Sequence, residues 1–270
     1  MNVKKKKQLI LFLFMMVIFS VNIVSASNMA NVSYDEELGN FRNVRAGKIG
    51  RNNLYRSQHP ANGSNRSLYA NVLAEENGIW TILNLSDTKS RLNKYLNENI
   101  VGSSYYYKKL YNKGRVYTAG IIEFQNNPLY RNRIAVSLKF FAKNKGPYLV
   151  HCQVGRERTG MVILVLESLM GASYSYMVDD YAQSFMNVNG YNRTKAKKTA
   201  ILRVNEGLCF ITGKKGVTNW SKVNFIPFAE NFLKQGGMTG GEIAALKKNL
   251  SVSYPKRNIT LESLCIDKSR

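Results

Sequence analysis

The chain has 270 residues, enough for one large domain or one domain with an appendage. Its 39 basic and 17 acidic side chains give a formal charge of +22 at pH 7, which favours anionic partners such as phosphorylated substrates or an anionic membrane surface. A solvated surface rich in lysine and asparagine is the alternative. No arginine-rich tail or nucleic-acid module accompanies the charge, so nucleic acid is excluded as the expected partner.

The N-terminus has the features of a secretory signal peptide. Lys4 to Lys7 precede an apolar run from Leu9 to Val24, and the small-residue site Val24-Ser25-Ala26 follows it. We expect cleavage after Ala26, which removes residues 1–26, reduces the charge to +18 and sends the protein out of the cell or to the cell envelope. An uncleaved anchor is the alternative, because the run approaches the roughly 17 residues that span a bilayer.

The first half of the mature chain is predicted to mix loops with one helix and one buried strand. Residues 28–60 are polar and rich in Gly, Asn and Arg, which indicates loops and short strands over the surface. Ser64 to Asn77 predicts a helix with a glycine stop. The bounded apolar segment from Ile79 to Leu85 predicts a buried strand. Arg91 to Gly120 is polar and is predicted to form a strand and a mobile loop.

The second half is predicted to be mainly helical. Leu129 to Asn144 has apolar residues at helical spacing, and Gly146-Pro147 ends this pattern before a short strand, Tyr148 to His151. Arg158 to Met170 is long, apolar and followed by a glycine, as expected for a buried helix. Ser173 to Asn187 repeats large apolar residues every four positions and predicts another helix on the core.

The composition of the sequence changes beyond about Gly207. Glycine-rich loops are predicted there, followed by a last helix that begins with the capping box Thr239-x-x-Glu242. We therefore divide the mature chain into a main domain, residues 27–206, and a helical and loop extension, residues 207–270, packed on the same domain. The alternation of strands and helices predicts an α/β fold with a mostly parallel central sheet flanked by helices.

The segment from His151 to Gly160 carries the residues that point to chemistry. It joins a predicted strand to a predicted buried helix, so backbone N–H groups and the positive end of the helix dipole converge on one point and form an anion site. Cys152 heads this loop. The dipole and Arg158 both favour its thiolate, which is the nucleophilic form of cysteine.

The other residues of the loop suit a bound phosphate. The planar fork of Arg158 holds two oxygens of a phosphoryl group, which a lysine does poorly. Thr159 has a hydroxyl to donate to the sulfur, and Gly155 permits a turn that a side chain would block. The expected catalytic residues in the loop are Cys152, Arg158 and Thr159, and the expected substrate-binding residues are Gln153, Val154, Gly155, Arg156 and Glu157.

This Cys-x5-Arg-Thr-Gly pattern, preceded by His151, resembles the signature of the cysteine-dependent protein tyrosine phosphatase superfamily. The resemblance implies a tyrosine-phosphatase-like fold and hydrolysis of phosphomonoesters, protein phosphotyrosine first and with dual specificity as an option, through a cysteinyl-phosphate intermediate. No metal or other cofactor is needed, because Arg158 and the loop amides stabilise the developing charge.

More of the chain resembles one branch, the bacterial secreted tyrosine and dual-specificity phosphatases that also act on phosphoinositides. Phe41-Arg42-Asn43, Tyr55-Arg56-Ser57, Ile82 to Asp87 and Asp180-Tyr181 carry this likeness in order and rough spacing. It covers roughly residues 40–189. Those enzymes often have Lys-Asp inside the loop, whereas this chain has Arg156-Glu157, which keeps both charges and lengthens the acid.

The general acid is not given by a Trp-Pro-Asp tripeptide, which this sequence lacks. Asp87 is the first candidate, because it ends a buried strand and the carboxyl ends of parallel strands meet at the ligand crevice. Its alternative role is an Asx turn or a helix cap. Glu157 is the second candidate, with bracing of Arg56 or Arg158 as its alternative. Between Glu98 and the nucleophile the only acid is Glu123.

The remaining histidines, tyrosines and cysteines receive simpler interpretations. His151 is expected to orient the cysteine loop, and His59 is expected at the surface. The tyrosines 105 to 107 are interpreted as a strand with one face buried, with contact to a phosphotyrosine ring as the alternative. Cys209 and Cys265 either form a disulfide or are separately buried, and either arrangement leaves the nucleophile free.

Two rival functions stay open at the level of sequence. The first is a phosphatase for phosphoinositides or inositol polyphosphates, because Arg156 places a third cation beside the cradle for a second phosphate. The second is a phosphate-binding module without turnover, which the missing Trp-Pro-Asp acid suggests. Phosphate release from phosphotyrosine, lipid and soluble inositol substrates separates the three.

Overall fold

The computed structural model describes residues 35–98, 104–121 and 128–256. Its central sheet has the strand order β1-β2-β5-β3-β4. The strands are β1 (Arg42–Asn43), β2 (Leu54–Ser57), β3 (Thr81–Asn84), β4 (Val116–Thr118) and β5 (Tyr148–His151). Only β1 runs antiparallel to its neighbour among these strands, and the other three pairings are parallel. The predicted α/β fold with a mostly parallel sheet is confirmed.

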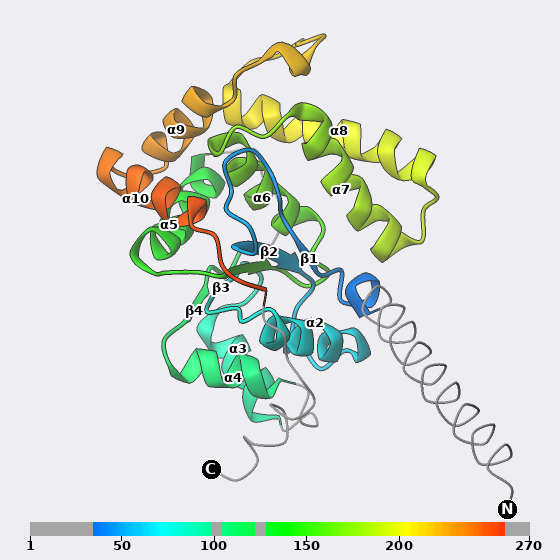
Figure 1. Cartoon of the computed structure of the whole chain (residues 1–270), viewed down its shortest axis with the longest axis vertical. Coiled ribbons are helices and arrows are strands. Elements are labelled where there is room, and N and C mark those ends of the chain that lie inside the picture. Colours follow the sequence, from blue (N-terminus) through cyan, green and yellow to red (C-terminus); the bar gives the residue numbers. More distant parts are fainter. Residues whose placement is uncertain (1–34, 99–103, 122–127, 257–270) are drawn as a thin grey trace, which may run out of the picture.

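Helices cover both faces of this sheet (Figure 1). On one side lie α2 (Asn65–Glu76), α3 (Lys89–Asn97) and α4 (Tyr105–Asn112). On the other side lie α5 (Pro128–Lys143), α6 (Glu157–Leu169), α9 (Ile226–Gln235) and α10 (Gly240–Ser251), with η1 (Trp220–Lys222) as a short 3-10 turn. The long pair α7 (Tyr174–Asn189) and α8 (Arg193–Thr212) packs against α6.

The two faces of the sheet explain why its central strands are apolar without alternation. Ile82 and Leu149 point into the smaller core beneath α2, α3 and α4. Leu83 and Val150 point into the larger core formed by the other helices. A strand buried on both faces needs apolar residues at successive positions, which is the pattern that the sequence shows in β3 and β5. Both predicted strands are confirmed, as are the helices that correspond to α2, α5, α6 and α7.

The short strands predicted within residues 28–60 are present as β1 and β2, but the predicted surface course is wrong for β2. β2 pairs with β5 inside the sheet, and all four of its residues are buried. Arg56, the most polar of them, has no exposed surface. Its partners, Asp180 and the carbonyl of Gly155, lie far along the chain and are invisible to a local pattern.

The prediction of a strand and a mobile loop for Arg91 to Gly120 is also wrong in its main part. The described residues of this segment form α3 and α4, and among them only Val116–Thr118 is a strand. Tyrosine favours strands, which led to the strand interpretation of the three tyrosines. Tyr106, Tyr107 and Leu110 instead pack together in the smaller core, and burial at helical spacing overrides that preference.

The C-terminal part is more helical than predicted. α8 continues through residue 207, the predicted start of the extension, and α9 was not expected. The capping box that opens α10 is confirmed: Thr239 Oγ1 accepts from Glu242 N at 3.1 Å, and Glu242 Oε2 accepts from Thr239 N at 2.9 Å. Both α9 and α10 pack on α5. The division into a domain and an extension stays a prediction.

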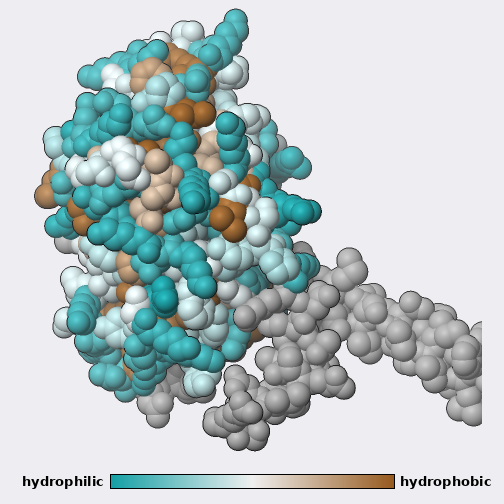
Figure 2. Space-filling view, turned by 60° about the vertical axis from the view of Figure 1, so that its left-hand side comes forward, coloured by the Kyte–Doolittle hydropathy of each residue, from teal (hydrophilic) through white to brown (hydrophobic). Residues whose placement is uncertain are grey.

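Some predictions concern residues outside the described ranges. The signal peptide lies there, as does Cys265, so its pairing with the half-buried Cys209 stays a prediction. In the described part of the chain, no helix is both long and apolar enough to span a membrane. The face seen in Figure 2 carries mostly hydrophilic residues, with hydrophobic ones in small separate groups.

Candidate active site

The loop that begins at Cys152 connects β5 to the N-terminus of α6, as the sequence predicts. Cys152 is almost fully buried at the base of the loop. Gly155 makes the sharpest turn, with φ at +71°, and a Cβ there would lie 2.2 Å from the carbonyl oxygen of Ser57. The left-handed conformation and the close approach to β2 both require glycine at this position.

The carbonyl oxygens of the loop are held from behind by the segment around β1 and β2. Asn40 Nδ2 donates to Val154 O at 3.0 Å and to Gly155 O at 3.1 Å. Arg56 Nη2 donates to Gly155 O at 2.9 Å. In a planar trans peptide the carbonyl and the next amide N–H point in opposite directions, so these bonds turn the following amides toward the opposite side of the loop. This geometry, together with the N-terminus of α6, is the one that an anion site needs, and phosphate binding at the loop stays a prediction.

A cavity of about 510 Å³ opens at this loop. The loop and the first turn of α6 contribute Cys152, Val154, Arg156, Glu157 and Arg158 to its lining. The remaining lining residues come from three helices: Met161 and Leu164 from α6, Tyr181 from α7, and Arg203, Glu206 and Gly207 from α8. The buried cysteine thus shares one accessible cavity with three arginines.

Arg158 and Thr159 occupy the first turn of α6. Arg158 Nη1 donates to Ile121 O at 2.7 Å, which fixes one end of the guanidinium. The Oγ1 atom of Thr159 is buried and has no hydrogen-bond partner among the described residues. This leaves a hydroxyl donor available beside the loop, as the expected contact with the sulfur requires.

Glu157 is held at the rim of the same cavity. Its Oε1 accepts from Arg156 Nε at 2.9 Å, and its Oε2 accepts from the hydroxyl of Tyr181 at 3.0 Å. Burial, together with the negative charge of Glu157, raises the pKa of Tyr181 well above its usual value, so this hydroxyl keeps its proton. The ion pairs of Glu157 are with Arg156 and Arg203 rather than with Arg56 or Arg158, which departs from the bracing role considered for it.

Asp87, the first candidate acid, lies in a different environment. It has no exposed surface, and its Oδ2 accepts from His59 Nε2 at 2.6 Å and from Asn84 Nδ2 at 2.9 Å. Burial raises the pKa of this carboxyl, but the hydrogen bonds from His59 and Asn84 outweigh burial and lower it below its usual value. A carboxyl that stays ionised is a poor proton donor, so these contacts favour a structural role. Among the described residues, the acids that line the cavity are Glu157 and Glu206.

His59 is buried, so the prediction of a surface histidine is wrong. Its Nδ1 accepts from the amide of Ala61 at 2.9 Å, which places the ring proton on Nε2, the atom that donates to Asp87. The side chain is therefore committed to the buried cluster beside the sheet. Its ring meets the ring of His151 edge to face, with centroids 4.6 Å apart.

His151 connects this cluster to the loop. Its Nε2 is 2.9 Å from the hydroxyl of Tyr107, which also accepts from Asn84 Nδ2 at 3.1 Å. Its Nδ1 is 3.4 Å from the carbonyl oxygen of Cys152. Burial and the neighbouring His59 lower the pKa of His151 well below its usual value, so the ring is neutral at pH 7. These contacts agree with an orienting role and give no sign of a base.

A model of the tyrosine phosphatase family matches residues 36–252, from before β1 to just after α10. The chain belongs to the tyrosine phosphatase family. No curated protein gives a significant match to the sequence. The match contains the Cys152 loop, and family membership supports phosphatase activity on a phosphorylated substrate. Membership in the secreted branch with phosphoinositide activity stays a prediction.

In this member of the tyrosine phosphatase family, Arg156 is held by other residues and is not free to move toward a second phosphate. Its Nη1 donates to Asn189 Oδ1, its Nε bonds to Glu157, and its guanidinium lies 5.2 Å from the centre of the Phe185 ring. The side chain lines the cavity but is held against α7. Its main contact is with the carboxylate that lies beside it.

Two cavity residues escaped sequence reasoning. Arg203 and Glu206 lie on α8, about 50 residues after the nucleophile, and pair with each other at 3.0 Å. Positions 203, 206 and 207 lie on one face of a helix, so helical spacing in the segment after Asn192 groups them together. Nothing in the sequence shows that this face turns toward the Cys152 loop.

Proposed function

We propose that this protein is a cysteine-dependent phosphatase that hydrolyses phosphotyrosine in proteins through a cysteinyl-phosphate intermediate. The observation that carries the proposal is the placement of Cys152 and Arg158 in one cavity, at a loop whose carbonyls are tied back and whose amides open a helix N-terminus. Membership in the tyrosine phosphatase family supports it. The binding of phosphate needs nothing beyond these groups.

In the first step, the Cys152 sulfur attacks the phosphorus and forms an S–P bond while the P–O bond to the leaving group breaks. Arg158 and the loop amides stabilise the charge on the equatorial oxygens. Glu157 gives a proton to the leaving oxygen. Its carboxyl lines the same cavity as Cys152 and is held there by contacts with Arg156 and Tyr181.

In the second step, water attacks the phosphorus of the cysteinyl-phosphate, and the S–P bond breaks. The Glu157 carboxylate takes a proton from this water, and inorganic phosphate leaves. Thr159 donates its hydroxyl to the departing thiolate, for which its unpartnered Oγ1 is suited. The group that acts as acid in one direction acts as base in the other.

Replacing the two candidate acids distinguishes their roles. Glu157→Gln is expected to lose about 10²–10⁴ in kcat with a phosphotyrosine peptide and much less with an aryl phosphate whose leaving group needs no proton. Asp87→Asn is expected to affect both substrates equally and to lower the free energy of unfolding by about 1.5–3 kcal/mol, because a charged acceptor of buried hydrogen bonds is lost.

The measurements are kcat with both substrates and unfolding by urea. A loss for Asp87→Asn that depends on the leaving group, without such a dependence for Glu157→Gln, restores Asp87 as the acid. If neither variant shows the dependence, the proton comes from another group, and Glu123, which lies outside the described residues, is the next to test.

The proposed function is tested by phosphate release from one panel of substrates. The panel holds phosphotyrosine, phosphoserine and phosphothreonine peptides, a phosphoinositide in vesicles and a soluble inositol polyphosphate. We expect the highest kcat/KM with phosphotyrosine, and activity with phosphoserine establishes dual specificity. Binding of inorganic phosphate without release from any substrate indicates the non-catalytic module.

A second candidate, a phosphatase for inositides, is favoured by Arg203. This side chain is half exposed and lines the cavity together with Arg156 and Arg158, and its Nε lies 3.9 Å from Glu157 Oε2. If it binds a second phosphate of the same substrate, Arg203→Ala is expected to lower kcat/KM about tenfold or more for the inositol polyphosphate and to leave the phosphotyrosine peptide nearly unchanged. An unchanged ratio of the two values removes this candidate.

We also propose that the protein is exported by its N-terminal signal peptide. The lysine cluster, the apolar run and the small-residue site support this location. The mass of the protein recovered outside the cytoplasm tests it, with a mature chain beginning at Ser27 as the expected result. A chain that keeps Lys4 to Lys7 contradicts cleavage.

A further inference from the structure

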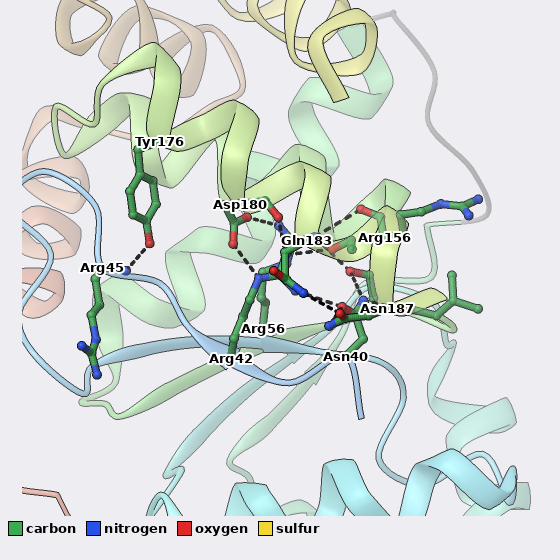
Figure 3. A network of polar contacts seen from close by, with 12 residues as sticks. Asn40, Arg42, Arg45, Arg56, Arg156, Tyr176, Asp180, Gln183 and Asn187 are labelled. Carbon is green, nitrogen blue, oxygen red and sulfur yellow. Dashed lines mark hydrogen bonds and ion pairs between the residues drawn. The ribbon is translucent and has the colours of Figure 1, made fainter. Parts of the chain in front are cut away.

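A buried ionic cluster connects α7 to the strands β1 and β2 (Figure 3). Asp180, on α7, sits between two arginines that come from β1 and β2. Its Oδ1 accepts from Arg42 Nε at 2.7 Å, and its Oδ2 accepts from Arg56 Nη1. The side chain of Arg56 has no exposed surface and that of Asp180 is only 5% exposed, so both charges depend on each other for solvation.

Arg56 connects the cluster to the loop. While Nη1 binds Asp180, Nη2 donates to Gly155 O at 2.9 Å and to Arg156 O at 3.4 Å. The guanidinium is planar and rigid, so the carboxylate that fixes one nitrogen also fixes the direction of the other. The orientation of two successive loop carbonyls thus depends on a carboxylate that touches neither of them.

Asn40 makes a second connection between Asp180 and the loop. Its Nδ2 binds the carbonyls of Val154 and Gly155, and its Oδ1 accepts from Arg42 Nη1 at 2.9 Å. Arg42 also donates to the main-chain oxygen of Asp180 at 2.6 Å. Three consecutive loop carbonyls, of residues 154 to 156, are therefore held by Arg56 and Asn40, and both are oriented through Asp180.

The charge of the cluster has the sign that an anion site needs. The charges of Arg42 and Arg56 outweigh burial and lower the pKa of Asp180, so it is ionised. Glu167, the other acid nearby, has its pKa raised well above the usual value, mainly by burial, and is neutral. Two arginines against one carboxylate leave one positive charge beneath the loop, screened little because it is buried.

We propose that Arg56, oriented by Asp180, is a positioning residue for the phosphate loop. It turns the carbonyls of Gly155 and Arg156 away from the cavity, so that the amides that follow them point at the bound phosphate and at the Cys152 thiolate. This inference rests on the proposed function for its chemical meaning. It assigns a role in phosphate binding to residues that touch neither the substrate nor the nucleophile.

The test compares Arg56→Lys, which keeps the charge and loses the fork, with Asp180→Asn, which keeps the shape and loses the charge. Both are expected to weaken the binding of inorganic vanadate about 10- to 100-fold, as the loss of one or two charge-assisted hydrogen bonds implies. Both are also expected to slow the alkylation of Cys152 by iodoacetate about tenfold, because the amides that face the sulfur lose their direction.

The matched control is Asn53→Ala. Asn53 is buried at the other end of β2, where its Nδ2 donates to the carbonyls of Asn249, Leu250 and Val252. This variant is expected to lose stability without any change in vanadate affinity or in the alkylation profile. It separates a general loss of packing from a change in the loop.

Two outcomes decide the inference. If Arg56→Lys and Asp180→Asn lose stability as Asn53→Ala does but keep the wild-type vanadate affinity and alkylation rate, the cluster is only structural. If Arg56→Lys fails to fold, Asp180→Asn and Asn40→Ala give the same readouts, and wild-type values in both overturn the proposal. Failure of the proposed function looks different, because the wild-type protein itself then releases no phosphate from any substrate.

Discussion

Cys152→Ser is expected to lower phosphate release by roughly 10⁴-fold or more and to keep the binding of inorganic phosphate within a few-fold of wild type. A serine hydroxyl stays protonated near neutral pH and lacks the nucleophilic sulfur, so the attacking group is lost. The cradle survives because Arg56 and Asn40 hold the loop through its carbonyls, without contact to the sulfur. The measurements are kcat with an aryl phosphate and calorimetric titration with phosphate.

Cys209→Ser is the matched control for this change. Cys209 is half-buried on α8 and does not line the cavity formed by the described residues. It is expected to keep full activity and to stay unreactive under conditions that alkylate Cys152. More than a few per cent of wild-type turnover in Cys152→Ser, or an equal loss in Cys209→Ser, contradicts a cysteinyl-phosphate at position 152.

The loop was predictable because everything that defines it is contiguous. A short apolar strand, a glycine turn and a helix that begins at Glu157 follow one another within about 20 residues. The strand ends at His151 and the turn needs a positive φ at Gly155, both of which the sequence indicates. The chemistry expected of Cys152 and Arg158 follows from this local order.

The partners of the loop were not predictable in the same way. Arg56 and Asp180 are 124 positions apart, and Asn40 lies 115 positions before the carbonyl of Gly155 that it binds. A polar residue that satisfies a buried carbonyl has the same appearance in the sequence as one that faces water. For this reason the segment around β2 was assigned to the surface, although it forms the back of the site.

The choice of acid shows a similar limit. The position of Asp87 after a strand is correct for a ligand crevice, but its side chain binds His59 and Asn84 in the buried cluster. Glu157 lines the cavity, and the hydroxyl of Tyr181 on α7 donates to its carboxylate there. Which of two carboxylates faces the nucleophile depends on such tertiary contacts and has no signature in the spacing of residues.

Arg158→Lys is expected to lower kcat by about 10²–10³ with a phosphotyrosine peptide, although the charge is conserved. The guanidinium is anchored at one end, where Nη1 donates to Ile121 O, and presents its remaining N–H groups as a fixed fork. A lysine ammonium is a point charge that binds one phosphate oxygen at a time and loses this alignment. The measurement is kcat and KM with the same peptide for both proteins.

The fall should lie mainly in kcat, because the fork fits the equatorial oxygens best when the phosphoryl group flattens between the sulfur and the leaving oxygen. Arg115→Lys is the matched control, since Arg115 donates to Asn144 at the opposite end of the parallel strands and is expected to tolerate lysine. Activity of Arg158→Lys within about threefold of wild type contradicts the assignment of Arg158 as a bidentate ligand of the phosphoryl group. A rise in KM alone assigns Arg158 to ground-state binding, in which case the loop amides and α6 carry the stabilisation of the transition state.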